Sequence, residues 1–378
     1  MAQRQFRSDD TSKWFYGFGN GHDGSTYVTP AYAGCSGTIS TKAVTIDTAS
    51  TFADGDLVLI HQSRGTSAGV WELNKIASGG GTTSLTMEHD LMNTYTDSGA
   101  SQAQVIELKE YNNLTVSSTI TAPLWDGNKG GIIAFLDKGT ATISGSLVAT
   151  GRGFDGYPGD TDPGRQGEGT PSIGGTRTTA ANGSGAGGGA VGGSNRCAGG
   201  GGGGHATSGG TGGTGGTGSA GGVGGGVVGN AALTLMDMGG AGGSGGGDIG
   251  AGGSAGNGGG IIVIIAKQIV VTGTIYSRGN NGGATSGTYE GCGGAGAGGS
   301  VLLKAEIATL GTTKIVATGG TGGTYSGAPS GGSGGTGRIH LDYSGSYTGT
   351  TSPTIDATLD STIVPPSVGG AAFLAFFM

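Results

Sequence analysis

Side chains that could do chemistry are few in this chain, and their spacing matches no known motif. The histidines lie far apart and outside any nucleophile or metal signature; they are His22, His61, His89, His205 and His340. The three cysteines are too few and too widely spaced for a disulfide framework. Cys197, His205 and Cys292 have side chains that can bind a metal, but their spacing fits no ligand pattern. The sequence therefore predicts a protein that is not an enzyme, that holds no cofactor and that has no metal site among its histidines and cysteines.

An acidic stretch, FDGYPGDTDPGRQGEG, begins at Phe154 and contains Asp155, Asp160, Asp162 and Glu168. Carboxylates at this density could bind calcium or a sugar. The stretch lacks the spacing of an EF-hand and the glycine-rich calcium repeat. A solvated turn and a receptor-contact loop are the other interpretations, and the sequence leaves calcium open.

Aromatic residues in the glycine-rich part stand at the ends of glycine-rich segments. Tyrosine among serine, glycine and asparagine is typical of binding loops. The alternative is that these rings cap the glycine-rich segments and cover β structure. The candidate receptor contacts are Phe154, Asp155, Tyr157, Asp160, Asp162, Arg165, Tyr276, Tyr289 and Tyr325.

The chain ends in GGAAFLAFFM, which is apolar but much shorter than a membrane span. Such a segment would aggregate if exposed, so it is expected to be buried on its own chain or between subunits. We expect assembly into a homo-oligomer, with Phe373, Leu374, Phe376, Phe377 and Met378 as candidate contacts. The N-terminal MAQRQFRSDDTSKW has no apolar segment of the kind that a secretory signal requires.

Composition excludes several classes of function. Glycine accounts for 93 of 378 residues, against a usual share of about 7%. The net charge is −7 and no basic stripe is present, which argues against nucleic acid and membranes as partners. Charged residues make up only 11%, whereas disordered chains are usually highly charged.

Four regions follow from the pattern of apolar runs. Residues 1–35 are an irregular lead-in or attachment segment. Residues 36–125 contain short β-type runs separated by turn signals, which predicts a small barrel or sandwich. Residues 126–345 carry a repeat of Gly-Gly, apolar strand, turn and second strand, with copies beginning at Gly130, Gly258, Gly298 and Gly335. Residues 346–378 form the apolar tail. Since no convincing helix occurs, the predicted class is all-β, with the repeats stacked like a β-helix.

Three glycine-rich excursions leave the predicted stack, at 151–260, 279–299 and 319–337. Gly-Gly-Thr runs have the three-residue period of a polyproline II helix. Several such glycine helices packed side by side could hydrogen-bond to one another, because only glycine lets the backbones approach closely. The excursions are therefore predicted to form a polyglycine II helix bundle; a flexible linker is the alternative.

This layout of glycine-rich excursions tied to β structure, over about residues 151–337, resembles the receptor-binding adhesins at the tips of tailed-phage fibres. The opening RQFRSDDTSKW is similar to N-termini of phage-like structural proteins. The resemblance implies a polyglycine II bundle that displays loops at its far end for a host cell-surface receptor, either a polysaccharide or an outer-surface protein.

The expected protein is thus a virion structural protein on the phage tail, made in the host cytoplasm and attached to other virion proteins. The alternatives are a subunit of an extracellular filament or coat, and an ice- or carbohydrate-binding module with a threonine–glycine face.

Overall fold

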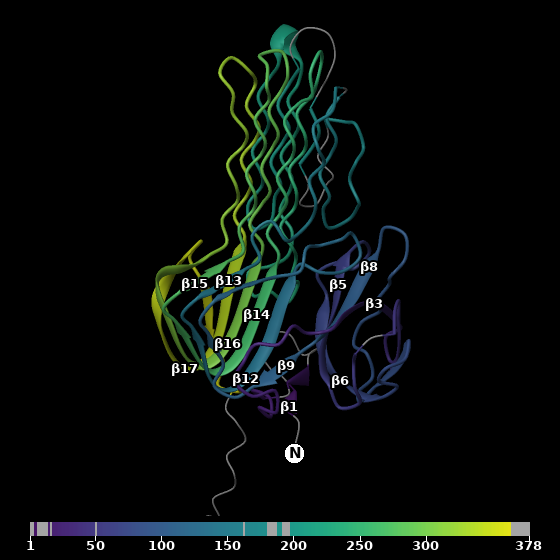
Figure 1. The fold of residues 1–378 in the computed structure, drawn as a ribbon, viewed down its shortest axis with the longest axis vertical. Helices are drawn as coiled ribbons and strands as arrows, with labels where there is room; N and C mark the ends of the chain where they lie inside the picture. Colours follow the sequence, from purple (N-terminus) through teal and green to yellow (C-terminus); the bar gives the residue numbers. More distant parts are fainter. Residues whose placement is uncertain are drawn as a thin grey trace, which may run out of the picture.

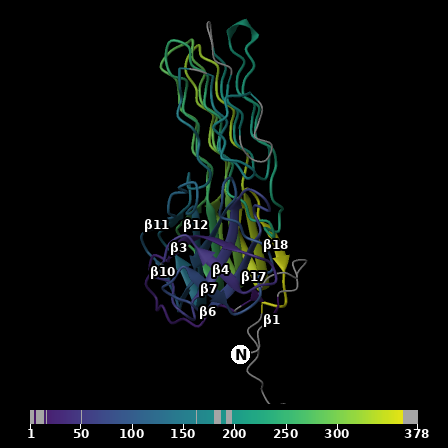
Figure 2. The same cartoon turned by 90° about the vertical axis from the view of Figure 1, so that its right-hand side faces the viewer.

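The computed structural model describes residues 4–5, 14–15, 17–49, 51–161, 163–179, 187–190 and 197–363. Figures 1 and 2 show a barrel beside a curled parallel sheet, with a tall bundle of glycine-rich segments rising from one end. The described residues contain no α-helix and one 3-10 turn, Gly216–Gly218. The short strands β1 (Arg4–Gln5) and β2 (Trp14–Phe15) pair antiparallel. The protein is therefore all-β.

Six antiparallel strands close the barrel, in the order β3-β4-β7-β6-β5-β8. They are β3 (Tyr32–Gly37), β4 (Ala43–Ile46), β5 (Leu57–Arg64), β6 (Trp71–Ser78), β7 (Ser84–Met87) and β8 (Gln102–Glu107). Strand β4 alternates, with Val44 and Ile46 inside, whereas β5 is buried along its whole length. Strand β5 has no exposed face because one side fills the barrel and the other packs on the parallel sheet. The small β domain is therefore a closed barrel and not a sandwich.

The second sheet is built from stacked parallel strands that follow the sequence repeat. Its strands are β9 (Lys109–Tyr111), β10 (Thr115–Val116), β11 (Thr119–Thr121), β12 (Ile132–Ile143), β13 (Ser146–Val148), β14 (Ile261–Val271), β15 (Thr274–Tyr276), β16 (Ser300–Val316), β17 (Arg338–Ser352) and β18 (Asp356–Leu359). The first residues of β12, β14, β16 and β17 lie in register: Ile132 with Ile261, Ser300 and Arg338 in turn. Each repeat copy therefore contributes one layer of the stack.

Two apolar cores hold the sheet. In β14, Ile262 and Ile264 face the core inside the curl, whereas Ile261, Val263 and Ile265 face the barrel. Full burial of such a side chain contributes about 1.5–3 kcal/mol. The unbroken apolar run Ile261–Ile265 is explained by this burial on both faces.

The boundaries of the barrel and of the parallel sheet differ from the region boundaries predicted from the sequence. Strands β9, β10 and β11 fall in the range predicted for the small β domain, but they pair with β12 and β13 of the parallel sheet. Strand β17 extends to Ser352 and β18 follows it, so the start of the predicted tail belongs to the stack. Residues 364–378, with the candidate assembly residues Phe373 to Met378, lie outside the described residues.

Within the bundle, backbone hydrogen bonds change partner with a period of three residues. The N–H groups of Cys292, Ala295 and Gly298 donate to the carbonyls of Pro329, Gly332 and Gly335. Those of Gly293, Gly296 and Gly299 donate to Gly283, Asn280 and Ser277, and those of Gly294 and Ala297 to Gly243 and Gly240. One segment is thus bonded to three neighbours around it, rather than to two as in a sheet.

Glycine is required by the distance between these segments. A Cβ atom on Gly294 would lie 2.0 Å from the carbonyl oxygen of Gly201, and one on Gly243 would lie 1.9 Å from that of Gly188. Both distances are far shorter than any normal contact, so larger residues would force the segments apart.

An apolar island in the first excursion, residues 231–238, docks the base of the bundle on the barrel. Leu233, Met236 and Met238 are buried there. Trp71 Nε1 donates to the carbonyl of Leu233 at 2.9 Å, and the Met236 N–H donates to that of Gly69 at 2.8 Å. This segment was expected inside the glycine bundle, and it instead ties bundle and barrel together.

Asp237 in this docking segment gives a pH-dependent stability. It is buried, and desolvation raises its pKa to about 6 although Arg338 opposes the shift. Because the unfolded pKa is about 3.9, the folded state binds this proton more tightly, and the contribution of Asp237 to stability grows as pH falls from above 6 to 4.

For Asp237→Asn, we therefore expect a flatter pH profile. The difference in unfolding free energy between wild type and variant should change by about 2–3 kcal/mol between pH 7.5 and pH 4, in favour of wild type at low pH. Urea denaturation across this range measures it. Parallel profiles for the two proteins would show that Asp237 does not titrate in this way.

Candidate functional site

Loops from three separate excursions meet at the far end of the bundle. We call the turns at 248–250, 286–290 and 325–328 the distal loops. Gly250 N–H donates to Glu290 Oε1 at 2.9 Å, and a Cβ on Gly327 would lie 3.3 Å from Thr288 Cγ2. The three turns therefore form one surface.

The distal loops carry exposed large side chains. Tyr289 is 47% exposed, Tyr325 is 41% exposed and Ile249 is 82% exposed. The structure thus brings two predicted tyrosines to one surface. Ile249 was missed because an isolated isoleucine in a glycine-rich stretch gives no periodic signal.

The other predicted contact residues lie elsewhere. Phe154 is fully buried and packs edge-on against Trp125, with ring centroids 6.0 Å apart, so it cannot touch a receptor. Its position near the apolar core, at the start of the excursion, was not visible in the sequence. Tyr276 ends strand β15 at the base of the bundle, where the Arg278 guanidinium carbon lies 3.9 Å from the centre of its ring.

Asp160 and Arg165 belong to a small charged group. A hydrogen bond from Arg177 lowers the pKa of Asp160, and Arg165 Nη2 lies 3.6 Å from the same carboxylate. Asp162 lies outside the described residues. The paired charges indicate that Asp160 stays ionised and is held by arginines.

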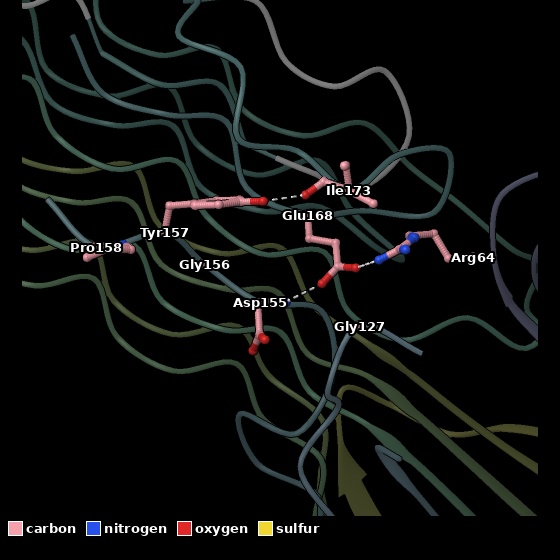
Figure 3. A pocket seen from close by; sticks show the side chains of 8 residues that line it. All are labelled: Arg64, Gly127, Asp155, Gly156, Tyr157, Pro158, Glu168 and Ile173. Atoms are coloured by element: carbon pink, nitrogen blue, oxygen red, sulfur yellow. Dashed lines mark hydrogen bonds and ion pairs between the residues drawn. The ribbon is translucent and has the colours of Figure 1, made fainter. Parts of the chain in front are cut away.

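Asp155 and Tyr157 instead line a pocket beside the barrel. We call it the junction pocket; its volume is about 400 Å³. Figure 3 shows its lining side chains, which come from the barrel, from a loop before β12 and from the first excursion. The lining residues are Arg64, Gly127, Asp155, Gly156, Tyr157, Pro158, Glu168 and Ile173.

One wall of the junction pocket is a buried ion pair. Arg64 at the end of β5 contacts Glu168, and both side chains are almost fully buried. Trp125 Nε1 donates to both Glu168 oxygens, at 3.1 and 3.0 Å, and the Asp155 N–H donates to Oε2 at 2.9 Å. A buried carboxylate with this many donors is fully compensated.

Asp155 supplies the other charge in the pocket. Its Oδ1 accepts a bond from Asn257 Nδ2 at 2.7 Å. Burial raises its pKa, and the nearby Asp126 adds to the shift. Tyr157 donates its hydroxyl to the carbonyl of Ile173 at 2.8 Å, which fixes the ring over the pocket.

The three candidate metal ligands, Cys197, His205 and Cys292, are buried. The carbonyl of Gly298 lies 2.8 Å from His205 Nδ1, within hydrogen-bond distance. Burial lowers the pKa of His205 to about 4, so its ring is neutral at pH 7. The part of the chain that the structure describes shows no group of three potential metal ligands. It also shows no helix long and apolar enough to cross a membrane.

Comparison with known proteins identifies no relative. No protein-family model, no curated protein and no solved structure matches the chain. The functional argument therefore rests on the geometry of the distal loops and the junction pocket.

Proposed function

We propose that the protein is a non-enzymatic virion structural protein, a tail-fibre or tail-tip adhesin of a bacteriophage that binds a receptor on the host cell surface. The observation that carries the proposal is the gathering of the exposed Tyr289, Tyr325 and Ile249 on the one surface that the distal loops form. Tyrosine gives a large contact area at low entropic cost, which suits recognition.

The glycine-rich segments are, in this proposal, polyglycine II helices. The three-residue period of their hydrogen bonds supports it, since this helix has three residues per turn. The close approach of the segments supports it too. A bundle bonded in all lateral directions would be stiff, and it would hold the distal loops away from the particle. Slow amide exchange over residues 291–299 is expected; exchange at random-coil rates would contradict the bundle.

In the working particle, the N-terminal part of the chain attaches to other virion proteins and several copies of the chain assemble. Each receptor contact is weak, and the number of copies raises the overall affinity. No secretory signal is needed, because a phage protein leaves the cell by lysis. Antibody against the chain should label the tails of purified particles in electron micrographs; unlabelled particles would count against the assignment.

Removing the exposed rings should weaken cell binding without unfolding the protein. For Tyr289→Ala with Tyr325→Ala, we expect at least a tenfold loss of binding to host cells, because interface tyrosines often contribute more than 1 kcal/mol each. Flow cytometry with labelled protein measures the loss, and the melting temperature serves as the folding control. Thr211→Ala, at an exposed position on the bundle, is the matched control and should bind normally.

A subunit of an extracellular filament is a second candidate, favoured by the end of the parallel sheet. Strand β18 pairs only with residues 340–343 of β17, so the described strands leave residues 344–352 of that edge, which include no charged residue, without a partner. An uncharged open edge is suited to pairing with another chain. Deleting residues 371–378 tests the apolar tail predicted to assemble, since polymers formed by the shortened chain would contradict this candidate.

A further inference from the structure

We propose that the junction pocket is a second binding site, for one neutral sugar unit of a polysaccharide, separate from the distal loops. Its volume of about 400 Å³ lies in the range of small-ligand sites, about 300–1,000 Å³. The site rests on its own geometry, and it adds to the proposed function by naming a saccharide as a ligand class.

The walls of the junction pocket are fixed before any ligand arrives. Glu168 is held by Arg64, Trp125 and the backbone of Asp155. Asp155 is held by Asn257, and the Tyr157 ring is held through its hydroxyl. Preorganised side chains lose little entropy on binding, so even a small ligand gains net affinity.

The charges of the pocket select the ligand. Arg64 is neutralised by Glu168, so the residues that line the pocket present no unpaired cation to hold a phosphate or a carboxylate. The Asp155 carboxylate has Oδ1 bonded to Asn257, which leaves Oδ2 to accept hydrogen bonds. Asp126 lies close enough to raise the pKa of Asp155, so the site is acidic and repels anions. Hydroxyl groups, which donate to a carboxylate without carrying charge, match this site.

The apolar part of the pocket lining fits the C–H face of a sugar ring, whereas the carboxylate fits its hydroxyl groups. Tyr157 is half-buried, and Pro158 and Ile173 beside it are exposed, with Ile173 51% exposed. A pyranose presents C–H groups on its faces and hydroxyls at its rim. An aromatic ring beside a carboxylate therefore offers one partner for each part of the sugar.

Binding is tested by titrating the whole protein with two probes in saturation-transfer NMR: a neutral hexose trisaccharide and a uronic-acid trisaccharide. The neutral trisaccharide should saturate with a Kd on the order of 1 mM, and the uronic acid should bind at least tenfold more weakly. Absence of saturable binding by the neutral sugar would overturn the site. Tighter binding of the uronic acid than of the neutral sugar would also overturn it, since it would indicate that the pocket presents a positive charge.

Variants locate the site and separate it from the distal loops. Tyr157→Ala and Asp155→Asn should each weaken neutral-sugar binding at least tenfold, whereas Tyr157→Phe, which keeps the ring but loses the hydroxyl that holds it, should weaken binding less than Tyr157→Ala. Tyr289→Ala should leave sugar binding unchanged. Sugar binding lost through Tyr289→Ala but not through Tyr157→Ala would overturn the junction site. If the wild-type protein binds the sugar but does not bind host cells, the adhesin proposal is rejected and the proposed sugar site in the junction pocket is retained.

Discussion

Glu168→Gln is expected to lower the free energy of unfolding by about 3–5 kcal/mol, one of the largest effects of any single substitution in this protein. Three groups point N–H donors at the Glu168 oxygens: Arg64, Trp125 and the backbone of Asp155. A glutamine has one oxygen and one amide nitrogen, so it would place a donor against a donor. It would also leave the buried Arg64 without a counter-charge.

Urea denaturation at pH 7 measures this loss. Glu88→Gln is the matched control, because the Glu88 side chain is 38% exposed and lies 4.0 Å from Lys75 Nζ and 3.7 Å from His89 Nε2. Surface pairs of this kind are worth at most about 1 kcal/mol each. Replacing Arg64 and Glu168 together by methionine should recover part of the loss, since neither charge of this ion pair is then left buried without its partner. Equal losses for Glu168→Gln and Glu88→Gln would show that the ion pair does not stabilise the junction.

Gly294→Ala is expected to disrupt the glycine bundle, at a cost of more than about 3 kcal/mol. The added methyl would lie 2.0 Å from the Gly201 oxygen, which is backbone of a neighbouring segment and cannot rotate away. Separating the segments would break lateral bonds such as the one from Gly294 N–H to the Gly243 carbonyl, 2.8 Å long. Each lost bond costs about 1 kcal/mol, and the period of three spreads the damage to several neighbours.

The matched control is Gly210→Ala in the same bundle. A Cβ there would meet the backbone nitrogen of Ser333 at 3.1 Å, which a shift of a few tenths of an ångström relieves. Calorimetry and hydrogen-exchange mass spectrometry of residues 291–299 compare the two variants. If the Gly294→Ala and Gly210→Ala variants have the same melting temperature and the same amide exchange rates, the close contact between segments does not stabilise the bundle.

The sequence by itself determined the all-β class, the small β domain as barrel or sandwich, and the stacked repeat. These follow from local patterns: alternation in AVTI and SLTM, and an unbroken apolar run at Ile261–Ile265. Repeat copies can be aligned by eye, and their strands pair almost as the alignment predicts. Strand β3 was not predicted from the sequence, because YAGCSG consists mostly of small residues and shows no alternation of apolar and polar side chains.

Only the tertiary structure decided which residues form sites. Arg64 and Glu168 are 104 positions apart, and the contact between them exists only because the first excursion folds back against the barrel. The same fold buries Phe154 and leaves Tyr289 exposed, although both stand at the ends of glycine-rich segments. Local patterns record which face of a strand is apolar. They do not record which distant segment will cover it, because that depends on the lateral packing of the whole chain.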